Sequence, residues 1–148
     1  MDNKSTKKPE LIFRDLHVDD RGYVYGAFDN LDKSGIKRTY VVENFARGMV
    51  RAWHGHKKAD TYIHVIRGSA KVAAVKIGDA NDYLVQTMSY KKPAVFYVPA
   101  GYYNGTMSLE DNTVFLIYST ITLDECAVDD FREKWDAFPT DIWNVGKR

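Results

Sequence analysis

The sequence predicts an all-β fold, an antiparallel sandwich or barrel, from the alternation of short β-forming runs with turn signals. Short runs rich in β-branched and aromatic residues alternate with clusters of Asp, Asn, Gly and Ser along most of the chain. Turn clusters that recur this often are typical of strands joined by hairpins and short loops. The length of 148 residues is that of one domain with one hydrophobic core.

Each predicted strand lies between turn signals. The run 94–98 is bracketed by Pro93 and Pro99, and proline limits a strand because it cannot donate to the hydrogen-bond ladder. The stretch between Gly48 and Gly68 is also rich in β-forming and aromatic residues. The other predicted strands are 23–28, 36–44, 71–77, 83–88, 102–109 and 113–121.

Only the last quarter of the chain has a helical pattern. Helical spacing is found at Val128, Phe131, Arg132 and Trp135. We therefore predict a short C-terminal helix that extends through Trp135 and is ended by Pro139. Asp124 or Asp129 is expected to cap its N-terminus, because aspartate accepts hydrogen bonds from the first free N–H groups of a helix.

Composition and charge exclude several classes of partner. The formal net charge of +1 gives no broad electrostatic field toward nucleic acid or a membrane. No apolar run approaches the roughly 18 residues that cross a bilayer. Residues 1–9 are polar and lysine-rich, which predicts a flexible N-terminus without a signal region, followed by a single domain at 10–148. The single cysteine, Cys126, excludes an intrachain disulfide and suits a reducing cytoplasm, where we expect this protein.

The stretch 48–68 carries the clearest functional signal. It contains His54 and His56, and in a strand the side chains at positions i and i+2 leave the same face. Both imidazoles should therefore point into one space, with Arg51 and two lysines beside them. This arrangement suits either a bound metal or proton transfer on a small anionic molecule.

The spacing in this stretch resembles the first signature of the cupin superfamily. That signature has a glycine, His-x-His, an acid and a second glycine, which correspond here to Gly48, His54, His56, Asp60 and Gly68. The second signature, Pro-x-Gly-x-x-His, is matched by Pro99 and Gly101, but Asn104 stands where the histidine belongs. The two signatures in this order imply a cupin jelly-roll barrel, to which the sequence adds the short C-terminal helix.

Longer runs resemble one group of cupins, the dTDP-sugar isomerases and epimerases. The runs 36–40 and 51–58 are similar to the dTDP-4-keto-6-deoxyglucose 3,4-ketoisomerases, whereas 132–143 is more similar to the dTDP-4-dehydrorhamnose 3,5-epimerases. The resemblance implies an enzyme that takes a nucleotide-linked 4-keto-6-deoxy sugar in deoxysugar or polysaccharide biosynthesis. It also implies a homodimer that pairs through an N-terminal strand. The chain has no Gly-x-Gly-x-x-Gly loop or Walker sequence, so we expect no cofactor.

The substrate chemistry of this group assigns the catalytic roles. A ketone acidifies the adjacent C–H, so isomerisation and epimerisation both need a base, a stabilised enolate and a proton donor. An imidazole with a pKa of about 6.5 is well matched to remove such a proton. By resemblance His54 is the base, and His56 either hydrogen-bonds the sugar or takes part in a second proton transfer.

Cations near the imidazoles are expected to bind the negative charges. Arg51 and Lys57 are the candidates for stabilising the oxyanion, because charge placed where an oxyanion develops lowers the barrier. Lys37 and Arg38 are the candidates for holding the diphosphate, since guanidinium groups pair well with phosphate oxygens. The remaining predicted substrate-binding residues follow the Pro-x-Gly turn: Tyr102 and Asn104.

Two tyrosines are candidates for the proton donor. The epimerases use a tyrosine on the strand after the Pro-x-Gly turn, and a gapless match places Leu116 at its position. Tyr118 lies two residues further on and is expected on the same face. Tyr40 matches a tyrosine of the ketoisomerase pattern. At the position of the aspartate that orients the epimerase histidine this chain has Ala137, with Asp136 beside it, which weakens the prediction of a double epimerase.

Other readings of the same residues remain open. Many cupins hold a divalent metal with three histidines and a carboxylate, and His54, His56 and Asp60 offer part of that set. Asn104 is a poor replacement for the third imidazole, so we expect no metal. We predict a 3,4-ketoisomerase first and a 3- or 5-epimerase second. A metal-dependent cupin and a non-catalytic sugar-binding cupin are the further alternatives.

Overall fold

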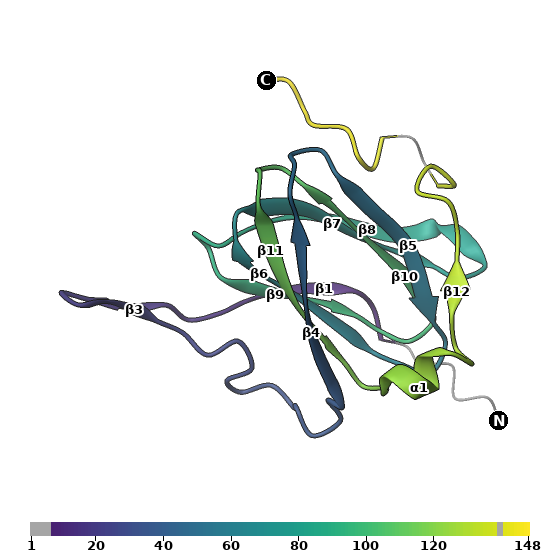
Figure 1. The fold of residues 1–148 in the computed structure, drawn as a ribbon, viewed down its shortest axis with the longest axis horizontal. Coiled ribbons are helices and arrows are strands. Elements are labelled where there is room, and N and C mark those ends of the chain that lie inside the picture. Colours follow the sequence, from purple (N-terminus) through teal and green to yellow (C-terminus); the bar gives the residue numbers. More distant parts are fainter. Residues whose placement is uncertain (1–6, 139–140) are drawn as a thin grey trace.

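Two five-stranded antiparallel sheets pack face to face in the computed structural model, which describes residues 7–138 and 141–148 (Figure 1). The first sheet has the order β1 (Glu10–Phe13), β9 (Ala94–Val98), β6 (Thr61–Arg67), β11 (Thr113–Ser119) and β4 (Arg38–Asn44). The second has the order β12 (Phe131–Arg132), β5 (Val50–His56), β10 (Tyr102–Ser108), β7 (Ser69–Lys76) and β8 (Asp79–Ser89). This jelly-roll-like arrangement confirms the predicted all-β fold.

The core lies between the two sheets. Phe96 and Val72 come from different sheets, and each side chain is fully buried. Along β11 buried and half-buried residues alternate, so that Phe115 and Ile117 face the other sheet. This alternation is the signal that the sequence carried, since one face of each strand packs inward.

Two signature glycines have backbone conformations that explain their presence. Gly101 turns the chain into β10 with φ of +92°, and Gly68 joins β6 to β7 with φ of +80°. Both values lie in the left-handed region that disfavours residues with a Cβ atom. At Gly68 a Cβ would also lie 2.5 Å from Oγ1 of Thr113. The glycines of the two signatures therefore shape turns.

The C-terminal segment differs from the predicted helix. Only one helical turn forms, α1 (Leu123–Cys126), and its N-cap is Thr122, whose hydroxyl accepts from the backbone N–H of Glu125. Phe131 and Arg132 then form β12 on the free edge of β5. The prediction of a longer helix was wrong because isolated helices of this length are marginal, and the unpaired edge of β5 offers backbone hydrogen bonds to this segment. Pro139, the predicted end of the helix, lies outside the described residues.

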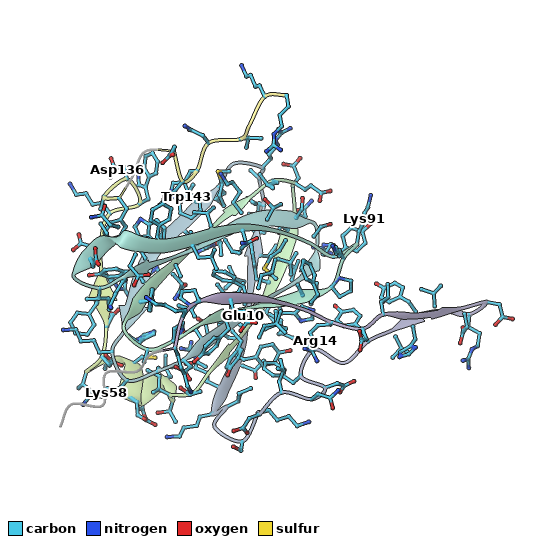
Figure 2. All side chains as sticks on the ribbon, turned by 180° about the vertical axis from the view of Figure 1, so that it is seen from behind. Glu10, Arg14, Lys58, Lys91, Asp136 and Trp143 are labelled. Carbon is cyan, nitrogen blue, oxygen red and sulfur yellow. The ribbon has the colours of Figure 1, made fainter. Side chains whose placement is uncertain are left out.

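The strands β2 (His17–Asp19) and β3 (Gly22–Val24) form a hairpin that projects away from the two sheets (Figure 1). Arg14, labelled in Figure 2 at the base of this hairpin, donates hydrogen bonds to the carbonyl groups of Gly26 and Asp29. Val18, Tyr23 and Val24 on the hairpin are largely exposed. Most of the predicted flexible N-terminus lies outside the described residues.

The C-terminal tail packs on the outer face of the second sheet. Trp53 of β5 is buried against Phe138 and Trp143, and its indole N–H donates to the carbonyl of Trp135. These contacts anchor the chain beyond β12. No helix among the described residues has the length and hydrophobicity that crossing a membrane requires.

Candidate active site

A cavity of about 340 Å³ opens between the two sheets, beside α1. The second sheet supplies a polar wall: Arg51, His54, His56, Asn104, Thr106 and Arg132. The first sheet supplies a more apolar wall: Arg38, Tyr40, Val42, Ile63, Phe115 and Ile117. The lining is completed by Leu123, Cys126 and Asp130. Six of the residues predicted from the sequence therefore meet here: Arg38, Tyr40, Arg51, His54, His56 and Asn104.

His54 and His56 both line this cavity from the end of β5, as their spacing predicts. Nδ1 of His56 lies 2.5 Å from the carbonyl oxygen of Asp129. A carbonyl oxygen can only accept, so Nδ1 donates in this hydrogen bond, and Nε2 is left for a ligand. The backbone of Asp129 thus fixes the orientation of the His56 ring.

The side chain of Asp129 holds the turn that follows His56. One carboxylate oxygen accepts from the backbone N–H of Lys57 at 2.8 Å, and the other accepts from that of Lys58 at 2.9 Å. Asp129 is 4% exposed, so these bonds lie in a largely dry environment. The sequence suggested Asp129 only as a helix cap. In the structure Asp129 instead holds the turn at Lys57 and Lys58, which is distant in the sequence.

His54 lies in an electrostatic environment that favours the neutral imidazole. Its pKa is lowered from the ordinary 6.5, first by desolvation from the cavity walls and then by the positive charge of Arg132. The carboxylate of Asp130 opposes this change, whereas Arg51 and His56 add to it. A neutral imidazole near pH 7 is the form that can remove a proton.

Tyr40 faces the histidines from the opposite wall. Burial raises the pKa of its phenol, and the guanidinium of Arg38, which lies 4.2 Å from the ring centroid, opposes that rise. The phenol therefore remains protonated near pH 7. The cavity therefore has a proton acceptor, His54, on one wall and a proton donor, Tyr40, on the other.

The predicted cations separate into two sets. Arg51 is held inside the cavity, because its Nε donates to Oδ1 of Asn44 at 2.7 Å. Lys57 and Lys37 do not line the cavity: the ammonium of Lys57 lies 4.5 Å from the ring centroid of Phe131, and that of Lys37 pairs with a carboxylate of α1. Their predicted contacts with substrate have no support in this geometry.

Tyr118 and Tyr102 also lie outside the cavity lining. Tyr118 faces away from the core and packs edge-on against Phe28, with ring centroids 4.6 Å apart. Its neighbour Ile117 lines the cavity instead. The gapless match had assigned Leu116, and with it Tyr118, to the face of the strand that lines the cavity. Tyr102 is buried in the core, and its hydroxyl donates to Asp82.

The acid of the cupin signature has a structural contact. One carboxylate oxygen of Asp60 accepts from the backbone N–H of Ala100 at 2.9 Å, which ties the Pro-x-Gly turn to the start of β6. Asp60 does not line the cavity with the histidines. Within residues 7–138 and 141–148, no three side chains of His, Cys, Asp or Glu form a cluster suited to a metal ion.

Comparison with known proteins identifies the family. A family model described as dTDP-4-dehydrorhamnose 3,5-epimerase matches residues 7–128. The chain belongs to this family. It is therefore an enzyme of the sugar-nucleotide isomerase and epimerase group, as the sequence runs indicated. No curated protein matches the chain.

Solved structures of the same group share the fold. The dTDP-4-dehydrorhamnose 3,5-epimerase from Elizabethkingia anophelis is 17% identical with a TM-score of 0.78, over 95% of this chain and 84% of that one. ChmJ, a 3'-monoepimerase from Streptomyces bikiniensis solved with dTDP-quinovose, is 17% identical with a TM-score of 0.73. That match covers 86% of this chain and 70% of ChmJ.

Replacing Asp129 with Ala should destabilise the fold and the histidine site together. Two backbone N–H groups would lose their acceptors, and each buried, unpaired group costs about 1–3 kcal/mol. Chemical denaturation of Asp129→Ala should show this loss in the free energy of unfolding. The exposed Asp136, labelled in Figure 2, makes a matched control, and Asp136→Ala should change stability by less than about 0.5 kcal/mol. Equal stability of the two variants would contradict the assigned role.

Proposed function

We propose that this enzyme isomerises a nucleotide-linked 4-keto-6-deoxy sugar by transferring protons beside the ketone, without a cofactor. The observation that carries the proposal is the pair of imidazoles, His54 and His56, on one wall of a cavity whose opposite wall holds a protonated phenol, Tyr40. The family to which the chain belongs supports the substrate class. The single cysteine is consistent with our proposal of a cytoplasmic location.

The chemistry needs three contributions, and the cavity offers each of them. A neutral His54 removes the proton from the carbon next to the ketone, and the electrons move onto the ketone oxygen as an enolate. Arginine side chains in the cavity stabilise that negative oxygen. The proton then returns to carbon from an imidazolium or from Tyr40. The carbon that receives it decides the product.

We propose 3,4-ketoisomerisation as the specific reaction. It removes a proton from C3, adds one to C4 and also moves a proton between the two neighbouring oxygens. Two imidazoles side by side on one wall suit transfers among adjacent atoms, and the hydrogen bond of Nδ1 of His56 leaves its Nε2 for the sugar. Strand β11 presents Phe115 and Ile117 to the cavity, so it supplies no hydroxyl for a second face of the sugar.

Epimerisation at C3 or C5 is the second candidate. The family description and the similar structures are those of epimerases. An inversion needs a base and an acid on opposite faces of the sugar ring, and His54 and Tyr40 lie on opposite walls. This arrangement supports inversion at one centre.

Turnover in deuterium oxide should distinguish the two reactions. With dTDP-4-keto-6-deoxyglucose we expect a 3-keto product that carries deuterium at C4, observed by nuclear magnetic resonance. A product that keeps its carbonyl at C4 and has deuterium with inverted configuration at C3 or C5 would establish the epimerase instead. A sugar without label or rearrangement would contradict both.

The reaction should depend on pH through His54. Because the pKa of this imidazole is lowered from 6.5, kcat/KM should be constant near pH 7 and should fall only when the pH drops through a midpoint below 6.5. His54→Asn should reduce kcat by about 10²- to 10⁴-fold and abolish this acid limb. Binding of dTDP by the variant, measured by calorimetry, should be retained. Unchanged turnover would contradict the assignment of the base.

We also propose that the protein is a homodimer that pairs through its N-terminal hairpin. Val18, Tyr23 and Val24 on the hairpin are 73%, 61% and 68% exposed, and apolar residues gathered on a projecting hairpin favour contact with a second copy. Light scattering at micromolar concentration should give twice the 17.0 kDa of one chain. Val24→Asp should give the monomer mass, whereas Val128→Asp, at an exposed site on the body, should remain dimeric. A monomeric wild type would contradict this proposal.

A further inference from the structure

His54 lies in the middle of a row of three residues that crosses the second sheet. Arg132 of β12 is directly opposite it on one side, and Asn104 of β10 is directly opposite it on the other. Residues directly opposite in an antiparallel pair project from the same face, with Cβ atoms about 4.5–5.5 Å apart. All three line the cavity. The base therefore has a guanidinium as its immediate neighbour.

The position of Arg132 is fixed by backbone pairing. Trp53 and Glu133 exchange backbone hydrogen bonds of 3.1 and 3.3 Å, which continue the ladder between β5 and β12. This register places Arg132 beside His54 through backbone hydrogen bonds alone, without any contact made by the arginine side chain.

The side chain of Arg132 is held at one nitrogen and free at the others. Its Nε donates to both carboxylate oxygens of Asp130, at 3.1 and 3.0 Å. Neither of its Nη groups donates a hydrogen bond to a residue in the described part of the chain. The arginine side chain is 67% exposed, and such surface pairs contribute about 0–1 kcal/mol to stability. The pair is thus a poor stabiliser of the fold, while its free donors remain available to a ligand.

The other cavity arginines occupy different places. Arg51 uses its Nε to bond Asn44, and Arg38 stacks on Tyr40 of the opposite wall. Among the ionisable groups that act on His54, which are Arg132, Asp130, His56 and Arg51, Arg132 has the largest effect in lowering the imidazole pKa. Arg132 is thus the cation most strongly felt at the base.

We propose that Arg132 is a further catalytic residue, which contacts the ketone oxygen of the sugar, and that Asp130 positions it. This inference rests on the proposed function. When the C–H bond breaks, its proton passes to His54 and its electron pair ends on the ketone oxygen, where the guanidinium stabilises the enolate. When the new C–H bond forms, the proton returns and the negative charge disappears. No other reactant is consumed.

Both residues lie beyond the segment that the family model matches. The family match ends at residue 128, whereas Asp130 and Arg132 belong to the segment that closes the cavity afterwards.

Removing the charge of Arg132 should reduce the rate more than the binding. We expect Arg132→Met to lower kcat about 100-fold, as loss of an oxyanion donor does, while the Kd for dTDP changes less than about threefold. Arg132→Lys should recover part of kcat because it keeps the charge, and Asp130→Asn should give an intermediate loss. The control is Arg67→Met, which removes a comparably exposed arginine from an ion pair with Glu43 and should leave kcat unchanged.

Two results would overturn the assignment. One is an unchanged kcat in Arg132→Met. The other is a weaker affinity for dTDP that accounts for the whole loss, because the arginine would then bind the diphosphate and not the reacting sugar.

A measurement without substrate separates this inference from the proposed function. Titration of the His54 imidazole by nuclear magnetic resonance should show a higher pKa in Arg132→Met and a lower one in Asp130→Asn than in the wild type. If the wild type turns over no 4-keto sugar nucleotide, the proposed function fails, yet this titration still tests the arginine. Identical titration curves in all three proteins would overturn the inference.

Discussion

The candidate active site depends on the pairing of β5 with a neighbour on each side. β10 bonds one edge and β12 bonds the other, so the strand that carries His54 and His56 cannot shift along its axis. A slip of one residue would turn both imidazoles to the opposite face of the sheet, because side chains alternate along a strand. The orientation of the base is therefore fixed by backbone hydrogen bonds and not by its own contacts.

The two walls of the cavity contribute different groups to proton transfer. The second sheet supplies the imidazoles and the guanidinium groups of Arg51 and Arg132, and the first sheet supplies mainly apolar side chains with one phenol, Tyr40, and one guanidinium, Arg38. Apolar surface excludes water, and charges act more strongly on one another where water is scarce. Asp129 adds order to this arrangement, since its backbone orients His56 and its carboxylate holds the following turn.

Local patterns in the sequence predicted much of this. The recurring turn clusters indicated the β fold, and the spacing of the histidines placed both imidazoles on one face. The same reasoning failed where two local signals compete. Phe131 and Arg132 have helical spacing but pair with β5. A short helix is only marginally stable by itself, and the unpaired edge of β5 offers backbone hydrogen bonds to this segment. Tyr118 was predicted to face the cavity, but it points away from it. The prediction took the orientation of Tyr118 from an alignment with the family and could not use the observed register of β11.

The sequence by itself determined the fold class, the turn glycines and the paired imidazoles, because these follow from backbone stereochemistry and periodicity over a few residues. Only the tertiary structure decided which other groups meet them. Tyr40 reaches the cavity from the other sheet, and Asp129 and Arg132 come from a segment more than seventy residues beyond His56 and His54. Such contacts depend on the path of the whole chain, which no short stretch of sequence encodes.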